Sequence, residues 1–569
     1  MPINYSNNCN QIILSDEYED FIVEFNGDIS LIEELYQPEC IQLVSNRFAS
    51  IYMRRRGTEY INRYGYNSVP KCFGLLDMST LEETGVNRIR RQPYIDLYGQ
   101  DTLIGFIDTG IDYTHPVFRN TDNTSRILGI WDQTINEITE GSLGKKSEIY
   151  EFGVEYTKEM LDIALQSENP ESVVPTTDEI GHGTFMAGIA AGNEDLENDF
   201  SGIAPLSNIV AVKLKEAKPY LKKYYGIETQ VPCYQENDIM MGIRYLLRMA
   251  SQYGKPIVIC IGIGSNEGSH SGNLFLSEYL NIISQYIGVA TVTAAGNEVN
   301  LGHHYQGEIR EGITDEVELK ISDNEQGLYL EIWSKSPNEV TLGIVTPLGE
   351  TAEGIPIRDK REERVTFIFE KTVLYISKLE DMYTGNEVII VRFENPTPGI
   401  WNIKVHPQVV FYRNYHIWMP MEHFVEKDTY FLVPDPNITI CEPGNAESVM
   451  TMSTYNHKTQ AIYIQSSRGF TWNGVVKPDL AAPGVNVYGP VPGNKFSTKT
   501  GASVAAAQGA GLSALMMQWG IVEGYNLDMN TIKIKNYFIR GAKRQDIIYP
   551  NNEWGYGTID IYEALRIIQ

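Results

Sequence analysis

The sequence predicts an α/β protein in which a parallel sheet carries helices on both faces, preceded by a small α/β unit and interrupted by an all-β insertion. From about residue 100, short apolar segments alternate with longer amphipathic segments. This alternation stops between residues 305 and 432, where short strand-like segments follow one another, and it resumes after residue 433. At 569 residues the chain is too long for one hydrophobic core, so several domains are expected.

The α/β part contains apolar runs that are typical of strands buried on both faces of a sheet. These predicted strands lie at residues 103–107, 209–214, 257–263 and 289–293. Helical apolar spacing separates them at residues 238–249 and 274–286. Strands that alternate with helices in this way favour parallel pairing with the helices packed on both faces.

The first 66 residues predict a separate small α/β unit. Residues 21–25 alternate like a strand, residues 29–36 carry a helical apolar stripe, and residues 41–53 return to strand character. A Gly- and Tyr-rich stretch at residues 65–70 has the irregular composition of a linker.

Short alternating segments separated by turn residues predict an inserted β-sandwich that resembles a jelly roll. The predicted strands are residues 317–321, 328–333, 365–369, 373–376, 388–393 and 401–405. The predicted division of the chain is therefore 1–66, 67–304, 305–432 and 433–569.

Charge and composition exclude several classes of partner. The net charge of −27 disfavours nucleic acid and anionic membranes, and no apolar stretch is long enough to span a bilayer. The N-terminus lacks the pattern of a secretory signal, so we expect synthesis in the cytoplasm.

Six scattered cysteines predict free thiols in a reducing compartment; they are Cys9, Cys40, Cys72, Cys233, Cys260 and Cys441.

Three segments place candidate catalytic side chains at the ends of predicted elements. Asp108 follows an apolar strand and lies at the carboxyl edge of the sheet, where α/β proteins place their sites. His182 opens a helix of small residues, and a helix N-terminus favours the neutral imidazole. Ser503 lies at the start of another small-residue helix, near backbone amides that can stabilise an oxyanion.

A fourth candidate, Asn297, follows a predicted strand and the residues Ala-Ala-Gly. Taken singly, each candidate has an ordinary structural interpretation: Asp108 and Asn297 as turn residues, His182 as a structural histidine, and Ser503 as a helix N-cap. Without an active site, all four of these structural interpretations would have to hold at once. The combination, in the order Asp, His, Ser, therefore favours a hydrolase active site.

The chain resembles the subtilisin (subtilase) family in five successive blocks. These are DTGID at 108–112, GHGT at 181–184, AAGN at 294–297, KPDLAAPG at 477–484 and TGASVAA at 500–506. The resemblance implies a subtilisin-like fold and a serine endopeptidase that uses no cofactor.

The resemblance also implies a role for each candidate residue. Ser503 corresponds to the nucleophile, His182 to its general base, and Asp108 to the residue that orients the imidazole. Asn297, together with the backbone amide of Ser503, corresponds to the oxyanion hole.

Two further segments resemble the family's substrate cleft, because glycines at a sheet edge permit close approach of an extended peptide. The edge strand that pairs with substrate corresponds to Ile261, Gly262, Ile263 and Gly264, and the wall of the first specificity pocket to Ala294, Ala295 and Gly296. Gly262-Ile263 replaces the usual Ser-Leu, which predicts narrower specificity. Ala502 and Ala507 replace the usual Thr and Pro of the serine block, and neither position carries chemistry.

Residues 1–66 resemble the family's propeptide, which aids folding and is then removed by self-cleavage near Tyr66. Residues 68–75 would then resemble a mature N-terminus. A propeptide without a signal, a 206-residue separation between Asn297 and Ser503, and the segment GSNEGSHSG at 264–272 are similar to the Csp germination proteases of clostridial spores. That similarity implies incorporation into the spore and a cortex-lytic enzyme zymogen as the protein substrate.

Two other functions stay open from sequence alone. One is a pseudoprotease-like regulator or germinant-signalling scaffold, although all three residues of the triad are present. The other is a protease that cuts only itself and then acts as a binding module. A metal-dependent hydrolase is disfavoured because no HExxH motif occurs. Calcium sites occur in many members of the resembled family, but no acidic calcium loop is recognisable, so no metal ligand is predicted and calcium binding stays open.

Overall fold

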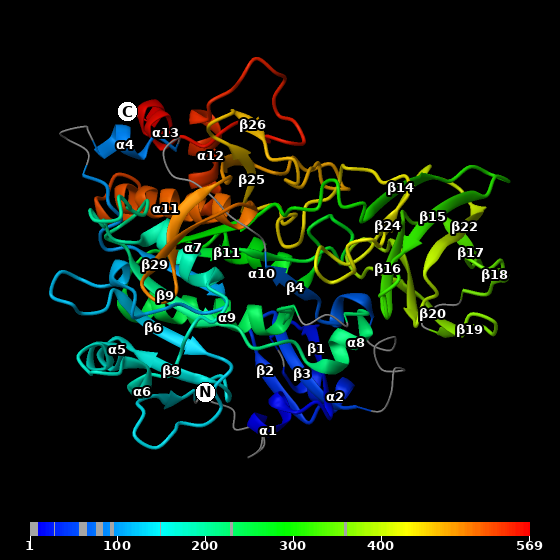
Figure 1. Cartoon of the computed structure of the whole chain (residues 1–569), viewed down its shortest axis with the longest axis horizontal. Helices are drawn as coiled ribbons and strands as arrows, with labels where there is room; N and C mark the ends of the chain where they lie inside the picture. Colours follow the sequence, from blue (N-terminus) through cyan, green and yellow to red (C-terminus); the bar gives the residue numbers. More distant parts are fainter. Residues whose placement is uncertain are drawn as a thin grey trace.

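A computed structural model describes residues 9–27, 29–55, 65–75, 84–90, 96–147, 149–227, 231–357 and 361–568. The molecule is elongated, with an α/β body at one end and a β-sandwich at the other (Figure 1). In the described part of the chain, no helix is both long and apolar enough to cross a membrane.

A ten-stranded mixed sheet forms the centre of the α/β body, in the order β26-β25-β13-β11-β5-β9-β6-β8-β7 with β27 beside β25. Its strands are β5 (Leu103–Asp108), β6 (Ile127–Asp132), β7 (Lys145–Lys146), β8 (Val154–Thr157), β9 (Asn208–Lys213), β11 (Ile257–Ile261), β13 (Val289–Ala294), β25 (Met450–Asn456), β26 (Ala461–Ile462) and β27 (Leu480–Pro483). Pairing is parallel from β27 to β6 and antiparallel at β8, β7 and β26. The predicted parallel centre is confirmed. The antiparallel edges were not predicted, because β7 and β26 are two-residue strands without an apolar run.

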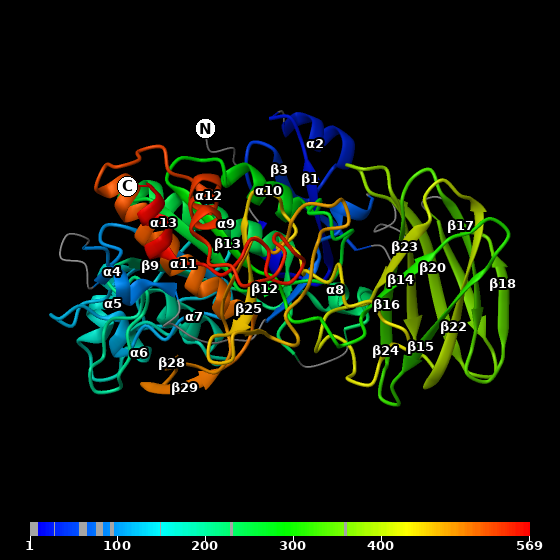
Figure 2. The same cartoon turned by 90° about the horizontal axis from the view of Figure 1, so that it is seen from above.

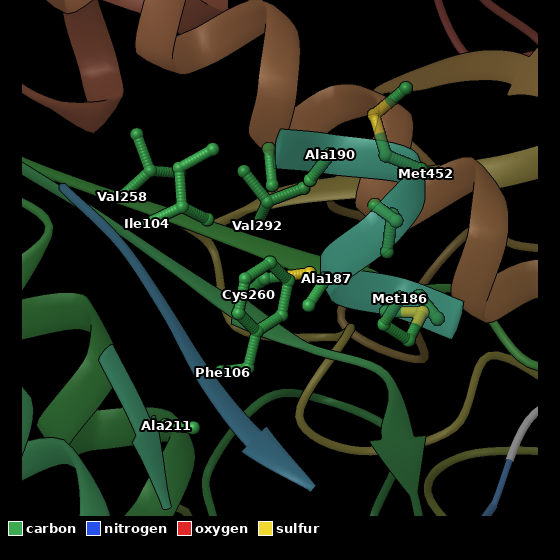
Figure 3. Packing of buried hydrophobic residues seen from close by; sticks show 14 of the residues in the cluster. Ile104, Phe106, Met186, Ala187, Ala190, Ala211, Val258, Cys260, Val292 and Met452 are labelled. Atoms are coloured by element: carbon green, nitrogen blue, oxygen red, sulfur yellow. The ribbon is translucent and has the colours of Figure 1, made fainter. Parts of the chain in front are cut away.

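Helices cover both faces of this sheet. Two wholly buried helices, α7 (His182–Ala191) and α11 (Ala502–Met517), pack on one face together with Ile104 and Phe106. Figure 3 shows this packing from close by. The other face packs against α9 (Glu236–Tyr253) and α10 (Phe275–Ile283). Successive residues of β5 thus enter opposite cores, as expected for a strand buried on both sides.

Shorter elements complete the α/β body. The helices are α4 (Val86–Arg90), η3 (Pro116–Phe118), α5 (Lys158–Leu165), α6 (Pro170–Val173), α8 (Pro219–Tyr224), the π-helical turn η4 (Gln518–Val522), α12 (Thr531–Gly541) and α13 (Ile561–Ile568). A hairpin is formed by β28 (Val487–Val491) and β29 (Lys495–Lys499).

The N-terminal unit is a three-stranded antiparallel sheet with two helices. It consists of α1 (Cys9–Leu14), β1 (Tyr18–Glu24), α2 (Ile29–Tyr36), β2 (Cys40–Leu43) and β3 (Phe48–Arg54), in the sheet order β1-β3-β2. The segment 41–53, for which strand character was predicted, forms two strands joined by a turn.

Two expectations about this region are wrong. Cys9 and Cys40 form a disulfide, because α1 packs beside β2 and brings their Cα atoms to 5.6 Å; the other four cysteines are free and buried. The 65–70 stretch is not an exposed linker. It contains a buried 3-10 turn, η1 (Tyr66–Ser68), and Lys71 behind it is fully buried.

The all-β segment forms two antiparallel sheets, whose strands run side by side at the right of Figure 2. One sheet has the order β14-β23-β16-β21-β20-β19 and the other β18-β17-β22-β15-β24. The strands are β14 (His304–Glu308), β15 (Asp315–Ile321), β16 (Gly327–Ser334), β17 (Glu339–Val345), β18 (Thr351–Ile355), β19 (Glu362–Phe367), β20 (Thr372–Glu380), β21 (Glu387–Glu394), β22 (Gly399–Val409), β23 (Asn414–Trp418) and β24 (Tyr430–Phe431). The inner faces of the two sheets enclose a separate apolar core that contains Trp401.

Substituting Trp401 tests whether this core holds the sandwich together. The indole is fully buried, contacts Phe367 and Phe393, and donates from Nε1 to the Thr397 carbonyl. We predict that Trp401→Ala lowers the unfolding free energy of the sandwich by about 3–5 kcal/mol. Phe369→Ala is the control, because that ring is 82% exposed and should change stability by less than about 0.5 kcal/mol. Differential scanning calorimetry measures both, and equal effects of the two substitutions would contradict the prediction.

Candidate active site

The candidate site lies at the carboxyl edge of the central sheet. Asp108 is the last residue of β5, which lies between β11 and β9, and its side chain is buried. Asp108 Oδ1 accepts the backbone N–H of Thr109 at 2.8 Å. This bond and the flanking strands fix the carboxylate at the point where α/β sheets present functional groups.

His182 is the first residue of α7 and lies between the other two candidate catalytic residues. Its Nδ1 is 2.7 Å from Asp108 Oδ1, and its Nε2 is 3.1 Å from Ser503 Oγ. An ionised carboxylate only accepts hydrogen bonds, so the imidazole proton belongs on Nδ1. Nε2 then presents its lone pair to the Ser503 hydroxyl, which is the tautomer that a general base requires.

Ser503 is the second residue of α11, and its side chain is buried. The first backbone N–H groups of a helix have no acceptor within the helix, so the amide of Ser503 can serve a negative oxygen beside the hydroxyl. One end of α11 therefore carries the hydroxyl and the backbone N–H of Ser503, and an oxyanion-binding role for that N–H stays a prediction.

Asn297 follows β13 and lies against the start of α11. The backbone N–H of Ala502 donates to Asn297 Oδ1 at 3.1 Å. Because an N–H group faces it, that atom must be the amide oxygen, and the Nδ2 donors lie on the other side of the amide. The sequence-predicted residues Asp108, His182, Ser503 and Asn297 thus come together from four distant parts of the chain.

The predicted edge strand passes directly beside these residues. Ile261 ends β11, and Ile263–Gly264 forms β12. A side chain at Gly262 would lie 2.6 Å from Met186 Cε, 3.0 Å from Ser503 Cβ and 3.4 Å from His182 Cε1. A side chain at this position would require Met186 Cε and the Ser503 side chain to shift.

Ala294, Ala295 and Gly296 connect β13 to Asn297. The main chain of Ala295 donates to Met452 O and accepts from Cys441 N. Gly296 has a φ of 106°, and a Cβ there would lie 2.4 Å from Cys441 Sγ. These three residues are held rigidly beside the site, and their role as a pocket wall stays a prediction.

A strand from the N-terminal region occupies the edge where a substrate peptide was expected. β4 (Cys72–Leu75) pairs antiparallel with β12 on one side and with β10 (Tyr234–Gln235) on the other. Sequence analysis missed this strand, because nothing in its four residues indicates which sheet edge they join. Phe73 of β4 is fully buried.

The surroundings of the site keep other ionisable groups neutral. Burial, with a further contribution from Asp108, raises the pKa of the Cys260 thiol and of the Tyr234 phenol. Cys260 is therefore no competing thiolate nucleophile.

Among the described residues, no group of three or more His, Cys, Asp or Glu side chains could hold a metal ion.

Comparisons with known proteins agree with this geometry. Residues 99–346 and 434–557 match the subtilase family. The C5a peptidase of Streptococcus pyogenes serotype M1 is 23% identical over 459 residues, which are 74% of this chain and 34% of that protein. Subtilisin-like protease SBT2.2 of Arabidopsis thaliana is 28% identical over 190 residues, which are 30% of this chain and 21% of that protein. The chain spans about a third or less of these relatives' lengths.

A solved structure extends the similarity to the overall fold. The CspB protease of Clostridium perfringens superposes with a TM-score of 0.76 at 28% identity, over 85% of this chain and 96% of that chain. The family match covers more than half of the sequence, and it includes the segments that contain Asp108, His182, Asn297 and Ser503. The chain belongs to the subtilase family of serine peptidases, and its fold is similar to that of CspB.

Proposed function

We propose that the chain is a serine endopeptidase in which Ser503 is the nucleophile. The observation that supports this most directly is the hydrogen-bonded series from Asp108 through His182 to Ser503. Ser503 Oγ attacks the peptide carbonyl while His182 Nε2 takes its proton. His182 then returns that proton to the leaving amine, and water hydrolyses the acyl-enzyme by the same route.

Asp108 and Asn297 stabilise the charges that develop in this reaction. The Asp108 carboxylate holds the imidazole in the required tautomer and stabilises the imidazolium that forms. The Nδ2 donors of Asn297 and the backbone N–H of Ser503 bind the oxyanion of the tetrahedral intermediate.

β4 acts in this proposal as the enzyme's first substrate. An extended segment paired with a sheet edge is the binding mode expected for a peptide in the cleft. β12 pairs Ile263 with Leu75, and a Cβ added at Gly262, the residue before Ile263, would lie 3.0 Å from Ser503 Cβ. Because the pair is antiparallel, the chain direction from Gly74 to Leu75 matches the direction from Gly264 back to Ile263, which is the direction of Gly262 and Ser503. The bond to be cut therefore belongs to residues 76–83, which lie outside the described residues.

This placement moves the proposed cleavage site away from Tyr66. The phenol of Tyr66 is buried and donates to the carboxylate of Glu331 in the sandwich, at 2.8 Å from both oxygens. Tyr66 is thus held against the sandwich, and it precedes the paired strand β4 in the chain. The N-terminal segment to be released extends at least to Leu75.

The resemblance to the Csp germination proteases suggests the physiological substrate. The fold similarity to CspB supports activation of a cortex-lytic enzyme zymogen during spore germination as the function of the mature enzyme. The occupied cleft favours one second candidate, a protein that cuts itself once and then acts as a scaffold with little further activity.

We predict that the wild-type chain cuts itself and that Ser503→Ala stays full length, because the variant lacks the nucleophile. The new N-terminus should map within residues 77–84. Ser513→Ala is a matched control, because Ser513 is a buried serine of the same helix that bonds to the Gly509 carbonyl, and this variant should still be cut. Denaturing gels and N-terminal sequencing read out the result. An intact wild-type chain, or a cut in Ser503→Ala, would refute self-cleavage.

We also predict that Asn297→Ala slows self-cleavage by about 10²–10³-fold, the magnitude observed for the oxyanion amide of subtilisin itself. Self-cleavage is intramolecular, so its rate reports the chemical step rather than substrate binding. The rate is measured by pulse–chase labelling in cell-free translation. Asn300→Ala, which removes an amide from the surface nearby, should cut at the wild-type rate. Equal rates for both variants would show that Asn297 does not stabilise the oxyanion.

A further inference from the structure

One buried carboxylate outside the triad joins the two segments that carry Asp108 and His182. Asp178 lies four residues before His182 and is 3% exposed. Its Oδ1 accepts from Thr109 Oγ1 at 2.7 Å and from the Gly181 N–H at 2.8 Å. Its Oδ2 accepts from the N–H and the hydroxyl of Thr184, at 2.8 and 2.6 Å.

Each of the two threonine hydroxyls also accepts a hydrogen bond from the opposite segment. Thr109 follows Asp108, and its Oγ1 accepts the N–H of Gly183 in α7 at 3.0 Å. Thr184 belongs to α7, and its Oγ1 accepts the N–H of Asp112 from the Asp108 loop at 2.9 Å. Each hydroxyl donates to Asp178 and accepts across the gap between loop and helix. A single carboxylate therefore orients both cross-links.

The backbone here leaves little room for adjustment. A Cβ at Gly183 would lie 2.1 Å from Gly110 O and 3.1 Å from Asp108 Cβ. Gly181, the N-cap of α7, has no side chain to cap the helix, so the bond from the Thr184 N–H to Asp178 takes that place. The position of the first turn of α7, which carries His182, is thus set by Asp178 and by this close contact.

We propose that Asp178 is a positioning residue for the proposed peptidase reaction, on which this inference rests. It touches none of the reacting atoms. Its four hydrogen bonds fix the loop after Asp108 relative to α7, and so preserve the 2.7 Å separation between Asp108 Oδ1 and His182 Nδ1. A helix cap without this role would contribute stability but would not affect the rate of catalysis.

The first test is Asp178→Asn. Asparagine has the shape of aspartate, but its NH₂ group donates hydrogen bonds where a carboxylate oxygen accepts them. Both oxygens of Asp178 accept from donors, so the NH₂ group faces donors in either orientation of the amide. The rate is measured as covalent labelling of Ser503 by a fluorophosphonate on the full chain. We expect the maximal labelling rate to fall by about 10–100-fold while the concentration for half-maximal rate stays the same, because small displacements of catalytic groups have effects of this size.

A second pair of variants separates positioning from folding. Thr109→Val removes the hydroxyl while keeping the side chain's shape, and it should slow labelling to a similar extent. Thr109→Ser restores the hydroxyl and should recover most of the wild-type rate. A purely structural defect at this site would follow side-chain shape instead, so serine would then be no better than valine.

Asp381→Asn is the matched control. Asp381 is a buried carboxylate of the sandwich whose Oδ2 accepts from the N–H and the hydroxyl of Thr384, as Asp178 does from Thr184. This variant should lose comparable thermal stability without slowing labelling. The inference is overturned if Asp178→Asn or Thr109→Val labels at the wild-type rate, or if Asp381→Asn slows labelling equally. If the wild-type chain is not labelled at Ser503 at all, the proposed function itself fails.

Discussion

The geometry of the site depends on the close packing of two buried helices. Every residue of α7 and α11 is buried, and both helices consist mostly of small residues. A Cβ added at Gly511 of α11 would lie 2.9 Å from the Ala190 carbonyl of α7 and 2.6 Å from Ile203 Cβ. Because interiors pack at crystal-like density, such a contact admits one separation of the helices. The N-termini of the two helices then meet, with His182 Nε2 3.1 Å from Ser503 Oγ.

One buried carboxylate of the sandwich contributes to the same region. Glu331 of β16 accepts from Tyr329 and Trp333 of its own strand, from the Tyr66 hydroxyl, and from the N–H of Gly268 at 2.9 Å. Gly268 lies four residues after Gly264, the end of β12. An unpaired buried carboxylate would cost several kcal/mol, so these donors must stay together. The insertion therefore holds both Tyr66 and the loop that contains Gly268.

The sequence was sufficient for features that depend on local pattern. The buried parallel strands, the helices on both faces and the four candidate residues were predictable, because each lies in a short segment whose residue types match its environment. Features that depend on which distant surfaces meet were not predictable. The partner edge of β4 and the buried position of Tyr66 depend on contacts with distant parts of the chain, and the Cys9–Cys40 pairing depends on the packing of α1 beside β2. Asp178 was not predicted, because its contacts with Thr109 and Thr184 form only when the end of β5 lies beside the start of α7.

β4 also determines what self-cleavage alone can accomplish in the proposed function. The strand is paired on both sides, and Lys71 just before it is buried, with Nζ donating to the carbonyls of Tyr66 and Val69 and lying 4.0 Å above the Tyr66 ring. None of these contacts involves a bond after Leu75, so cutting such a bond breaks none of them. Each ladder hydrogen bond contributes roughly 0.5–1.5 kcal/mol, and the buried groups would also have to be rehydrated or paired anew. Cleavage and departure of the N-terminal segment are therefore separate steps, and access of another protein to Ser503 depends on the second.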